Sequence, residues 1–235
     1  MHIRFRHNSI LLLGDTHSYQ RTHYVISKTP NLNGLDIVFL GDGGEGFGSR
    51  TMDEVSLRKI SLECEKRDVR LYCIRGNHSN PEIWGRGYGF SHLVLVPDYH
   101  TGIFPCGKRA LRVGGGVSID RTWRKSGLDY WPDEVTPYKK IGEKHDFLFA
   151  HDAPDYFNND TASLRLGPFS KLLSDDPGLF DDCLEQRNVM ARIVEDAEVK
   201  RCFSGHYHNS KKQLRNKIYY RCLDIEELLE FDASK

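Results

Sequence analysis

Asp, His and Asn side chains recur in five short motifs along this 235-residue chain, each beside a glycine or at the end of an apolar run. In chain order the motifs are Gly14-Asp15-Thr16-His17, Gly41-Asp42, Gly76-Asn77-His78, Ala150-His151 and Gly205-His206-Tyr207-His208. Carboxylate and amide oxygens and imidazole nitrogens together suit hard and borderline divalent cations. These side chains are more than one cation needs and, with one shared carboxylate, they suit two. Two cations roughly 3.5–4 Å apart are a known device for in-line displacement at phosphorus.

The spacing within two of the motifs favours binding to one cation. Asp15 and His17 are two residues apart just after an apolar run, and so are His206 and His208. In an extended chain that spacing points both side chains to the same face. Taken alone, the first motif is typical of a turn and the lone His151 of a capped strand end. The metal interpretation therefore depends on the motifs occurring together.

Short apolar runs precede the motifs and predict the strands that position them. Runs at residues 9–13, 36–40 and 69–74 each end at or just before a glycine, and residues 51–67 carry an imperfect apolar stripe typical of a helix. This order predicts βαβ units with a mostly parallel sheet, and open α/β sheets place their ligands at the carboxyl ends of the strands. Further strands are expected at 93–96, 109–113, 146–150 and 200–204, and a hairpin at 211–214 with 217–223.

The middle of the chain has a less regular pattern. Residues 120–145 are rich in Trp, Tyr, Pro and charge, which predicts a long surface excursion with a short helix near 134–144. Two further helices are expected, around 162–173 and at 182–197. The large aromatic side chains of the excursion are expected to cover the core rather than to form a base-stacking lid; they are Trp123, Tyr130 and Trp131.

In its five motifs the chain resembles the calcineurin-like metallophosphoesterase superfamily, and the resemblance spans residues 10–208. The family pattern is D-x-H, then G-D, then G-N-H-(D/E), then a lone His, then G-H-x-H. The resemblance implies an α/β fold, a four-layer αββα sandwich. It also implies two divalent metal ions as cofactors. Mn²⁺ is favoured by the oxygen-rich ligands, with Fe, Zn, Ni or Co as alternatives.

The resemblance also implies a role for each motif residue. The first metal would be held by Asp15, His17 and His208, and the second by Asn77, His151 and His206, with the carboxylate of Asp42 bridging both. The implied reaction is hydrolysis of a small phosphoester substrate by in-line attack of a metal-bridging hydroxide. His78 would be the general acid that protonates the leaving oxygen, a task suited to an unperturbed pKa near 6.5.

Two departures from the family pattern concern the catalytic histidine and the phosphate. Ser79 follows His78 where the family often has Asp or Glu, and Gly46 stands where the protein Ser/Thr phosphatase branch has a phosphate-clamping Arg. Glu45 occupies the position of the carboxylate that orients the catalytic His in that branch. It is therefore the candidate orienter of His78, with a flexible loop as the alternative. The missing Arg disfavours protein phosphatase activity and leans toward diester over monoester hydrolysis.

Other residues give weaker signals. Residues 114–121 and 130–134 resemble a bacterial and phage subgroup of small phosphoesterases. Guanidinium forks fit phosphate oxygens, so three arginines could contact a phosphate. Solvated surface charge is the favoured interpretation of each of them: Arg50, Arg121 and Arg124.

Length and composition predict a single domain over residues 1–235, with 39% hydrophobic residues to build a sizeable core. Lys+Arg and Asp+Glu each number 33, so the zero formal charge gives no support to a nucleic-acid partner or to the narrower alternative of a nuclease. A non-catalytic interaction module on the same scaffold is a third alternative. Such modules usually lose metal ligands, and here none is lost.

The cysteines and the N-terminus bear on the compartment. None of the six cysteines forms a C-x-x-C pair, which favours free thiols in a reducing cytosol and a cytoplasmic location. The apolar run at 10–13 is too short for a signal peptide, and no stretch approaches the ~20 apolar residues of a membrane span. No membrane partner is expected, and the oligomeric state is left open.

Overall fold

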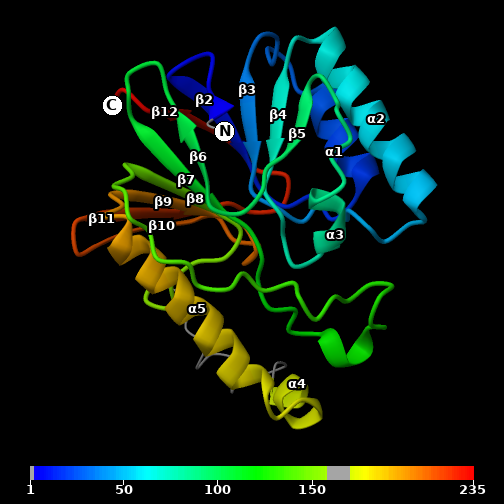
Figure 1. Cartoon of the computed structure of the whole chain (residues 1–235), viewed down its shortest axis with the longest axis vertical. Coiled ribbons are helices and arrows are strands. Elements are labelled where there is room, and N and C mark those ends of the chain that lie inside the picture. The colour runs from blue at the N-terminus through cyan, green and yellow to red at the C-terminus, as the bar shows by residue number, and fades with distance from the viewer. Residues whose placement is uncertain (1–2, 158–169) are drawn as a thin grey trace.

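Two sheets form the centre of the fold (Figure 1), in a computed structural model that describes residues 3–157 and 170–235. In the first sheet the strand order is β12-β2-β3-β4-β5. Strands β2 to β5 run parallel, and β12 pairs antiparallel with β2 at the edge. These strands are β2 (Ser9–Leu13), β3 (Asp36–Phe39), β4 (Arg70–Cys73), β5 (Leu93–Leu95) and β12 (Leu228–Asp232).

The second sheet has the order β1-β6-β7-β8-β9-β11-β10. Its centre is parallel from β7 through β8 and β9 to β11, whereas β6 and β10 pair antiparallel with their neighbours β7 and β11. Its strands are β1 (Ile3–Arg4), β6 (His100–Ile103), β7 (Arg109–Val113), β8 (Phe147–Ala150), β9 (Arg201–Ser204), β10 (Lys211–Arg215) and β11 (Ile218–Cys222).

Alternation along the strands packs the two sheets face to face. Ile10 and Leu12 of β2 share one buried cluster with Phe147 and Phe149 of β8, so these side chains fill the space between the sheets. Successive strand residues point to opposite faces. Each sheet therefore has a second apolar face that needs its own cover.

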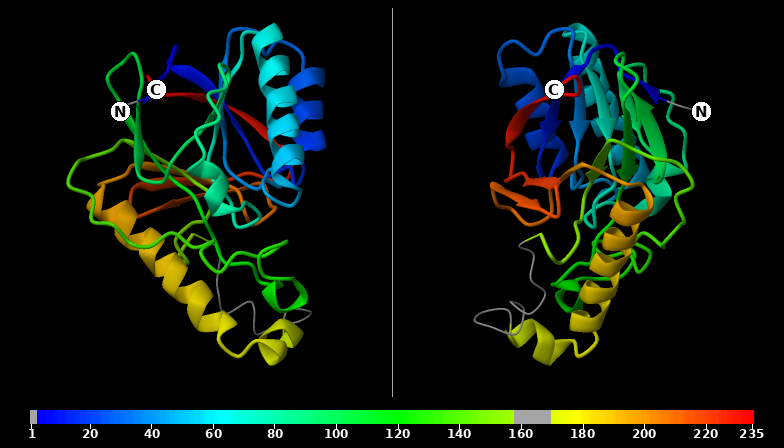
Figure 2. Two further views of the ribbon diagram at one scale, coloured as in Figure 1. Left: turned by 45° about the vertical axis from the view of Figure 1, so that its right-hand side comes forward. Right: turned by 90° about the vertical axis from the view of Figure 1, so that its left-hand side faces the viewer.

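Helices supply that cover on both outer faces. The outer face of the first sheet packs against α1 (Tyr19–Lys28) and α2 (Arg50–Lys66), and that of the second sheet against α5 (Leu179–Asp196). The right-hand view of Figure 2 shows α1 and α5 on opposite sides of the sheets. The expected four-layer αββα sandwich is confirmed. None of the described helices is both long and apolar enough to span a membrane.

Serine caps start the two helices of the first layer. Ser18 Oγ accepts a hydrogen bond from the backbone N–H of Arg21 at 3.2 Å, and Ser49 Oγ accepts one from that of Met52 at 3.3 Å. Each cap satisfies one of the N–H groups that a helix leaves without a partner at its start.

The structure confirms the expected strands and overturns part of the expected helix pattern. The helix expected near 134–144 is wrong: this stretch is irregular chain, in which Arg75 donates hydrogen bonds to successive backbone carbonyls from Asp133 onward. The helix expected around 162–173 is described only from Ser170, as α4 (Ser170–Asp175), since 162–169 lie outside the described residues. Helix α1 and strands β1, β6 and β12 were not foreseen. Two further short helices are α3 (Pro81–Trp84) and the 3₁₀ turn η1 (Arg121–Trp123).

Candidate metal centre

All five motifs follow the carboxyl ends of central strands. Three of them leave β2, β3 and β4 in the first sheet, and two leave β8 and β9 in the second. Because the sheets pack face to face, these loops meet across both sheets at one end of the sandwich. The expectation that ligands collect at the carboxyl ends of parallel strands therefore applies to both sheets at once.

The motif glycines permit close approach between these loops. A Cβ added to Gly76 would lie 1.9 Å from Oδ1 of Asp42, and one added to Gly205 would lie 2.0 Å from Oδ1 of Asp15. Any side chain at either position would displace a carboxylate of the neighbouring loop. At these two positions a candidate ligand from another motif occupies the space that a side chain would need.

Left-handed backbone conformations occur at some of the motif residues. Four motif residues have positive φ angles, a conformation that residues other than glycine seldom adopt. They are His17 (56°), Asp42 (59°), His206 (68°) and His208 (47°). Strained backbone of this kind persists where the surrounding structure enforces it, and such strain clusters at functional sites.

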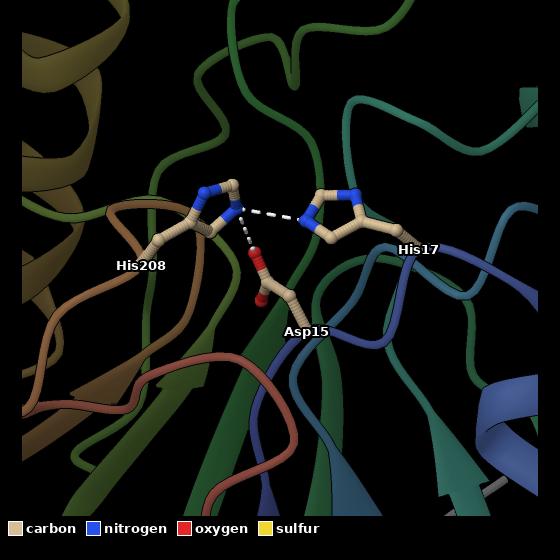
Figure 3. Close-up of side chains that lie close together, drawn as sticks. All are labelled: Asp15, His17 and His208. Atoms are coloured by element: carbon tan, nitrogen blue, oxygen red, sulfur yellow. Dashed lines mark hydrogen bonds and ion pairs between the residues drawn. The ribbon is translucent and has the colours of Figure 1, made fainter.

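Asp15, His17 and His208 form what we call the open ligand group (Figure 3). Their candidate ligand atoms lie within 4.8 Å of one another. Nε2 of His208 lies 3.1 Å from Oδ2 of Asp15 and 2.8 Å from Nε2 of His17. The Asp15 side chain is fully buried, whereas that of His208 is 42% exposed. The group therefore has one solvent-facing side.

Asp42, His151 and His206 form what we call the buried ligand group, and their candidate ligand atoms also lie within 4.8 Å of one another. Nε2 of His151 lies 3.4 Å from Oδ1 of Asp42 and 2.9 Å from Oδ1 of Asn77. The His151 side chain is fully buried, and that of Asp42 is 1% exposed. The amide oxygen of Asn77 is thus at hand as a fourth donor.

Asp42 connects the two halves of the centre. It belongs to the buried ligand group and also to a cluster with His17 of the open group and with His78. Its Oδ1 accepts the backbone N–H of His78 at 2.8 Å, and its Oδ2 lies 3.9 Å from His78 Nε2. A carboxylate in this place can offer one oxygen to each of two cations.

The electrostatics of the buried ligand group indicate a place for positive charge. Burial alone would lower the pKa of His151, but the nearby carboxylates of Asp42 and Asp15 outweigh burial and raise it to about 9. Burial likewise would raise the pKa of Asp42, but His151 and His78 hold it well below its usual range. Burial lowers the pKa of His206 far below its usual value, with His151 adding to the effect. An imidazolium here balances carboxylates that a divalent cation could balance instead.

Two outer contacts orient the ligands of the buried group. The Nδ1–H of His151 donates to the backbone carbonyl of Leu40 at 2.8 Å, which leaves Nε2 free to bind a metal. The Nδ2 of Asn77 donates to Ser118 Oγ at 3.0 Å, so its Oδ1 turns toward His151. Ser118 in turn donates its hydroxyl to Glu134 at 2.7 Å and its backbone N–H to the same carboxylate at 2.6 Å.

The contacts of His78 differ from those expected. Its ring nitrogens lie against the guanidinium of Arg124, at 3.1 Å from NH1 and 2.9 Å from NH2. Glu45 is buried and accepts a hydrogen bond from Ser79 Oγ at 2.7 Å, and burial raises its pKa to about 7. Among the described residues no hydrogen bond joins Glu45 to His78. An orienting role of Glu45 stays a prediction, and the contact that could transmit it is the one through Ser79.

The three arginines considered as phosphate contacts have different surroundings. Arg124 is 12% exposed and contacts His78, so the interpretation of it as solvated surface charge is wrong. Arg121 forms ion pairs with Asp176 and Asp182, and Arg50 is exposed at the first residue of α2.

Sequence reasoning missed Ser118 and Glu134 and gave Arg124 too little weight. Glu134 is 2% exposed, and burial raises its pKa to about 7. The available signal was the resemblance of residues 114–121 and 130–134 to a subgroup of phosphoesterases, since Ser118 and Glu134 lie in those two stretches. Their distance from the motifs in sequence concealed the contact with Asn77.

Comparisons with known proteins bear on the family and on the fold. The model of the calcineurin-like phosphoesterase family matches residues 9–210. A solved crystal structure superimposes with a TM-score of 0.52 at 11% sequence identity, covering 95% of each chain, which shows likeness of fold alone. No curated protein matches the chain in sequence.

Proposed function

Because the chain belongs to the calcineurin-like phosphoesterase family, whose members are generally metal-dependent hydrolases of phosphoesters, we propose that it hydrolyses a phosphoester at a pair of divalent cations. The observation that supports two cations is the position of Asp42. Its two carboxylate oxygens face different parts of the centre, and it belongs to clusters with ligands of both groups. One shared carboxylate between two sets of donors is the arrangement that two adjacent cations need.

The donors present fit two such cations. The first would be held by the open ligand group with Asp42, and the second by the buried ligand group with Asn77. Carboxylate, amide and imidazole donors without a thiolate suit Mn²⁺, and Fe, Zn, Ni or Co remain alternatives. When bound, the cations supply a Lewis acid for the phosphoryl oxygens and lower the pKa of a coordinated water.

His78 is the proposed general acid. Its backbone is held by the hydrogen bond from its N–H to Asp42, and its ring lies beside the centre with Nε2 3.9 Å from Oδ2 of Asp42. The ring of Phe47 lies near that of His78, with centroids 6.0 Å apart. In this role a proton on His78 would pass to a leaving oxygen held at the centre. General acids of this kind typically contribute ~10²–10⁴-fold to the rate.

Metal analysis and an assay panel test the proposal. The protein is stripped with EDTA, reloaded with Mn²⁺, and assayed on p-nitrophenyl phosphate, bis-p-nitrophenyl phosphate, an alkyl phosphate and oligonucleotides. We expect two Mn²⁺ per chain and hydrolysis of at least one phosphoester. Full activity with one metal or fewer would contradict the paired centre, and no hydrolysis at full metal loading would support the interaction-module alternative.

A variant tests the role of His78 separately. His78→Ala should keep both metals and lose ~10²-fold or more in turnover on the alkyl phosphate. The loss should be smaller for p-nitrophenyl phosphate, whose leaving group needs little protonation. The exposed His7 offers the control His7→Ala, since it precedes the amino end of β2 whereas the motif residues follow the carboxyl ends of strands. Equal losses on both substrates would exclude His78 as the acid.

A further inference from the structure

Arg124 contacts the proposed general acid from a segment that carries none of the five motifs. We propose that Arg124 binds the phosphoryl group of the substrate and makes the centre selective for phosphate monoesters over diesters. This inference rests on the proposed function and names its substrate class. It is the opposite of the sequence-based expectation, in which Gly46 in place of an Arg favoured diesters.

The hydrogen-bond donors of Arg124 can be accounted for one by one. A guanidinium has five N–H groups and no acceptor. Three of them are directed at oxygens: Nε to Asp120 Oδ1 at 2.7 Å, NH2 to Asp120 Oδ2 at 2.8 Å, and NH1 to the carbonyl of Asp129 at 3.1 Å. The other two, one on each terminal nitrogen, face Nδ1 and Nε2 of His78.

One of these two N–H groups has no acceptor in His78. A neutral imidazole carries a single lone-pair nitrogen, because its other nitrogen bears a proton. A protonated ring carries none, so neither form of His78 can accept from both N–H groups. The terminal fork of Arg124 therefore points two donors at a side chain that can accept only one bond.

A phosphoryl group that took the place of the His78 ring at the fork would satisfy both N–H groups. Phosphate oxygens match the two terminal N–H groups of Arg in a bidentate geometry, and such charge-assisted bonds are among the strongest in proteins. Asp120 already holds the other edge of the guanidinium, so little side-chain freedom remains to be lost on binding. The side chain is only 12% exposed, which strengthens its attraction for an anion relative to a surface arginine.

The oxygen count of the substrate gives the selectivity. A phosphate monoester has three terminal oxygens and up to two negative charges, whereas a diester has two and one. If each of the two proposed cations took one terminal oxygen, only the monoester would keep a third for Arg124. The diester presents a second substituent there instead, and the guanidinium would meet it without an equivalent bond.

Matched substrates and a matched control test this proposal. p-Nitrophenyl phosphate and bis-p-nitrophenyl phosphate share one leaving group, so the contribution of His78 as acid is similar for both. Arg124→Gln should lower kcat/KM for the monoester roughly tenfold or more beyond its effect on the diester, as expected for loss of a charge-assisted bond. Arg124→Lys should fall between, because it keeps the charge and loses the fork. Lys125→Gln, at an exposed neighbouring residue, should change kcat/KM for neither ester.

A binding measurement makes the outcome independent of turnover. Titration calorimetry of inorganic phosphate into the Mn²⁺-loaded protein should show roughly tenfold weaker binding for Arg124→Gln, at unchanged metal content and circular dichroism. Equal losses on both esters together with unchanged phosphate affinity would overturn the proposal and leave Arg124 as a positioning residue for His78. Wild-type protein that binds two Mn²⁺ but hydrolyses neither ester would overturn the proposed function instead. The phosphate titration alone would then decide whether Arg124 binds the anion.

Discussion

The open and buried ligand groups use the same residue types but differ in their surroundings. His208 of the open group is 42% exposed, whereas His151 of the buried group is fully enclosed. His151 also has the carbonyl of Leu40 behind it, and Asn77 has Ser118 and then Glu134. Charges attract more strongly away from water, and outer hydrogen bonds pre-orient ligands. The comparison suggests a firmly held cation in the buried group and a more readily exchanged one in the open group.

The largest expected effect comes from the residue that the two groups share. Asp42→Ala removes a carboxylate from both, so it should weaken both cations together and reduce activity by roughly 10³-fold or more, equivalent to several kcal/mol of lost stabilisation. Metal content after gel filtration and turnover on the best substrate measure this. The exposed Asp133 offers the control Asp133→Ala, which should keep both metals. Loss of only one metal from Asp42→Ala would show that the carboxylate does not bridge.

Removing one histidine from each group separates the two affinities. His208→Ala should mainly empty the open group, and His206→Ala the buried group. Each should weaken its own cation by more than roughly 100-fold, because even outer contacts of ligands are worth 10–100-fold. Calorimetric titration of Mn²⁺ into the metal-free variants resolves the two binding steps. The tighter binding step of the wild type should disappear in His206→Ala and persist in His208→Ala. Identical titrations for the two variants would abolish the distinction between the groups.

A smaller effect is expected from the outer contact of Asn77. Ser118→Ala removes the acceptor for its Nδ2 and frees the amide to rotate, which should weaken the buried cation by roughly 10–100-fold and leave the open one unchanged. Ser126, exposed in the same segment, offers the control Ser126→Ala. An equal weakening of both steps would mean that Ser118 stabilises the whole segment and does not specifically orient Asn77.

The last expected effect is a pH dependence of folding stability, which does not involve metal binding. Burial raises the pKa of Glu134 to about 7, above its unfolded value near 4.5. Between these values the folded protein retains a proton that the unfolded chain has released, so this group's contribution to the free energy of unfolding falls as pH rises from about 4.5 to 7. Glu134→Gln cannot titrate. Its stability relative to wild type should therefore rise across that window, by on the order of 2–3 kcal/mol.

Urea unfolding of metal-free protein at several pH values measures this difference. Taking the difference between variant and wild type cancels the histidines of the centre, which titrate in both. A difference for Glu134→Gln that does not change with pH would show that Glu134 is charged throughout and is stabilised by its bonds from Ser118.

The ligand motifs were readable from the sequence because each depends on local geometry. An apolar run, a glycine and a short polar segment define a strand and the turn at its carboxyl end, and the order of such units predicts a parallel sheet. The structure brings together all the side chains predicted to bind metal, in the open and buried ligand groups and beside them at Asn77. Helix α1 escaped notice because its cap, Ser18, directly follows the first motif, and β12 because an edge strand has a weak period.

What the sequence by itself determined is the set of candidate ligands, their order on the strands, and the αββα class that places them at one end of the fold. Only the tertiary structure decided which residues surround them. The segment between β7 and β8 has no regular period, and part of its course depends on side chains elsewhere, such as Arg75 bonding the carbonyls near Glu134. Such contacts between distant residues leave no local pattern. Hence Glu134 behind Asn77 and Arg124 against His78 became visible only once the chain was folded.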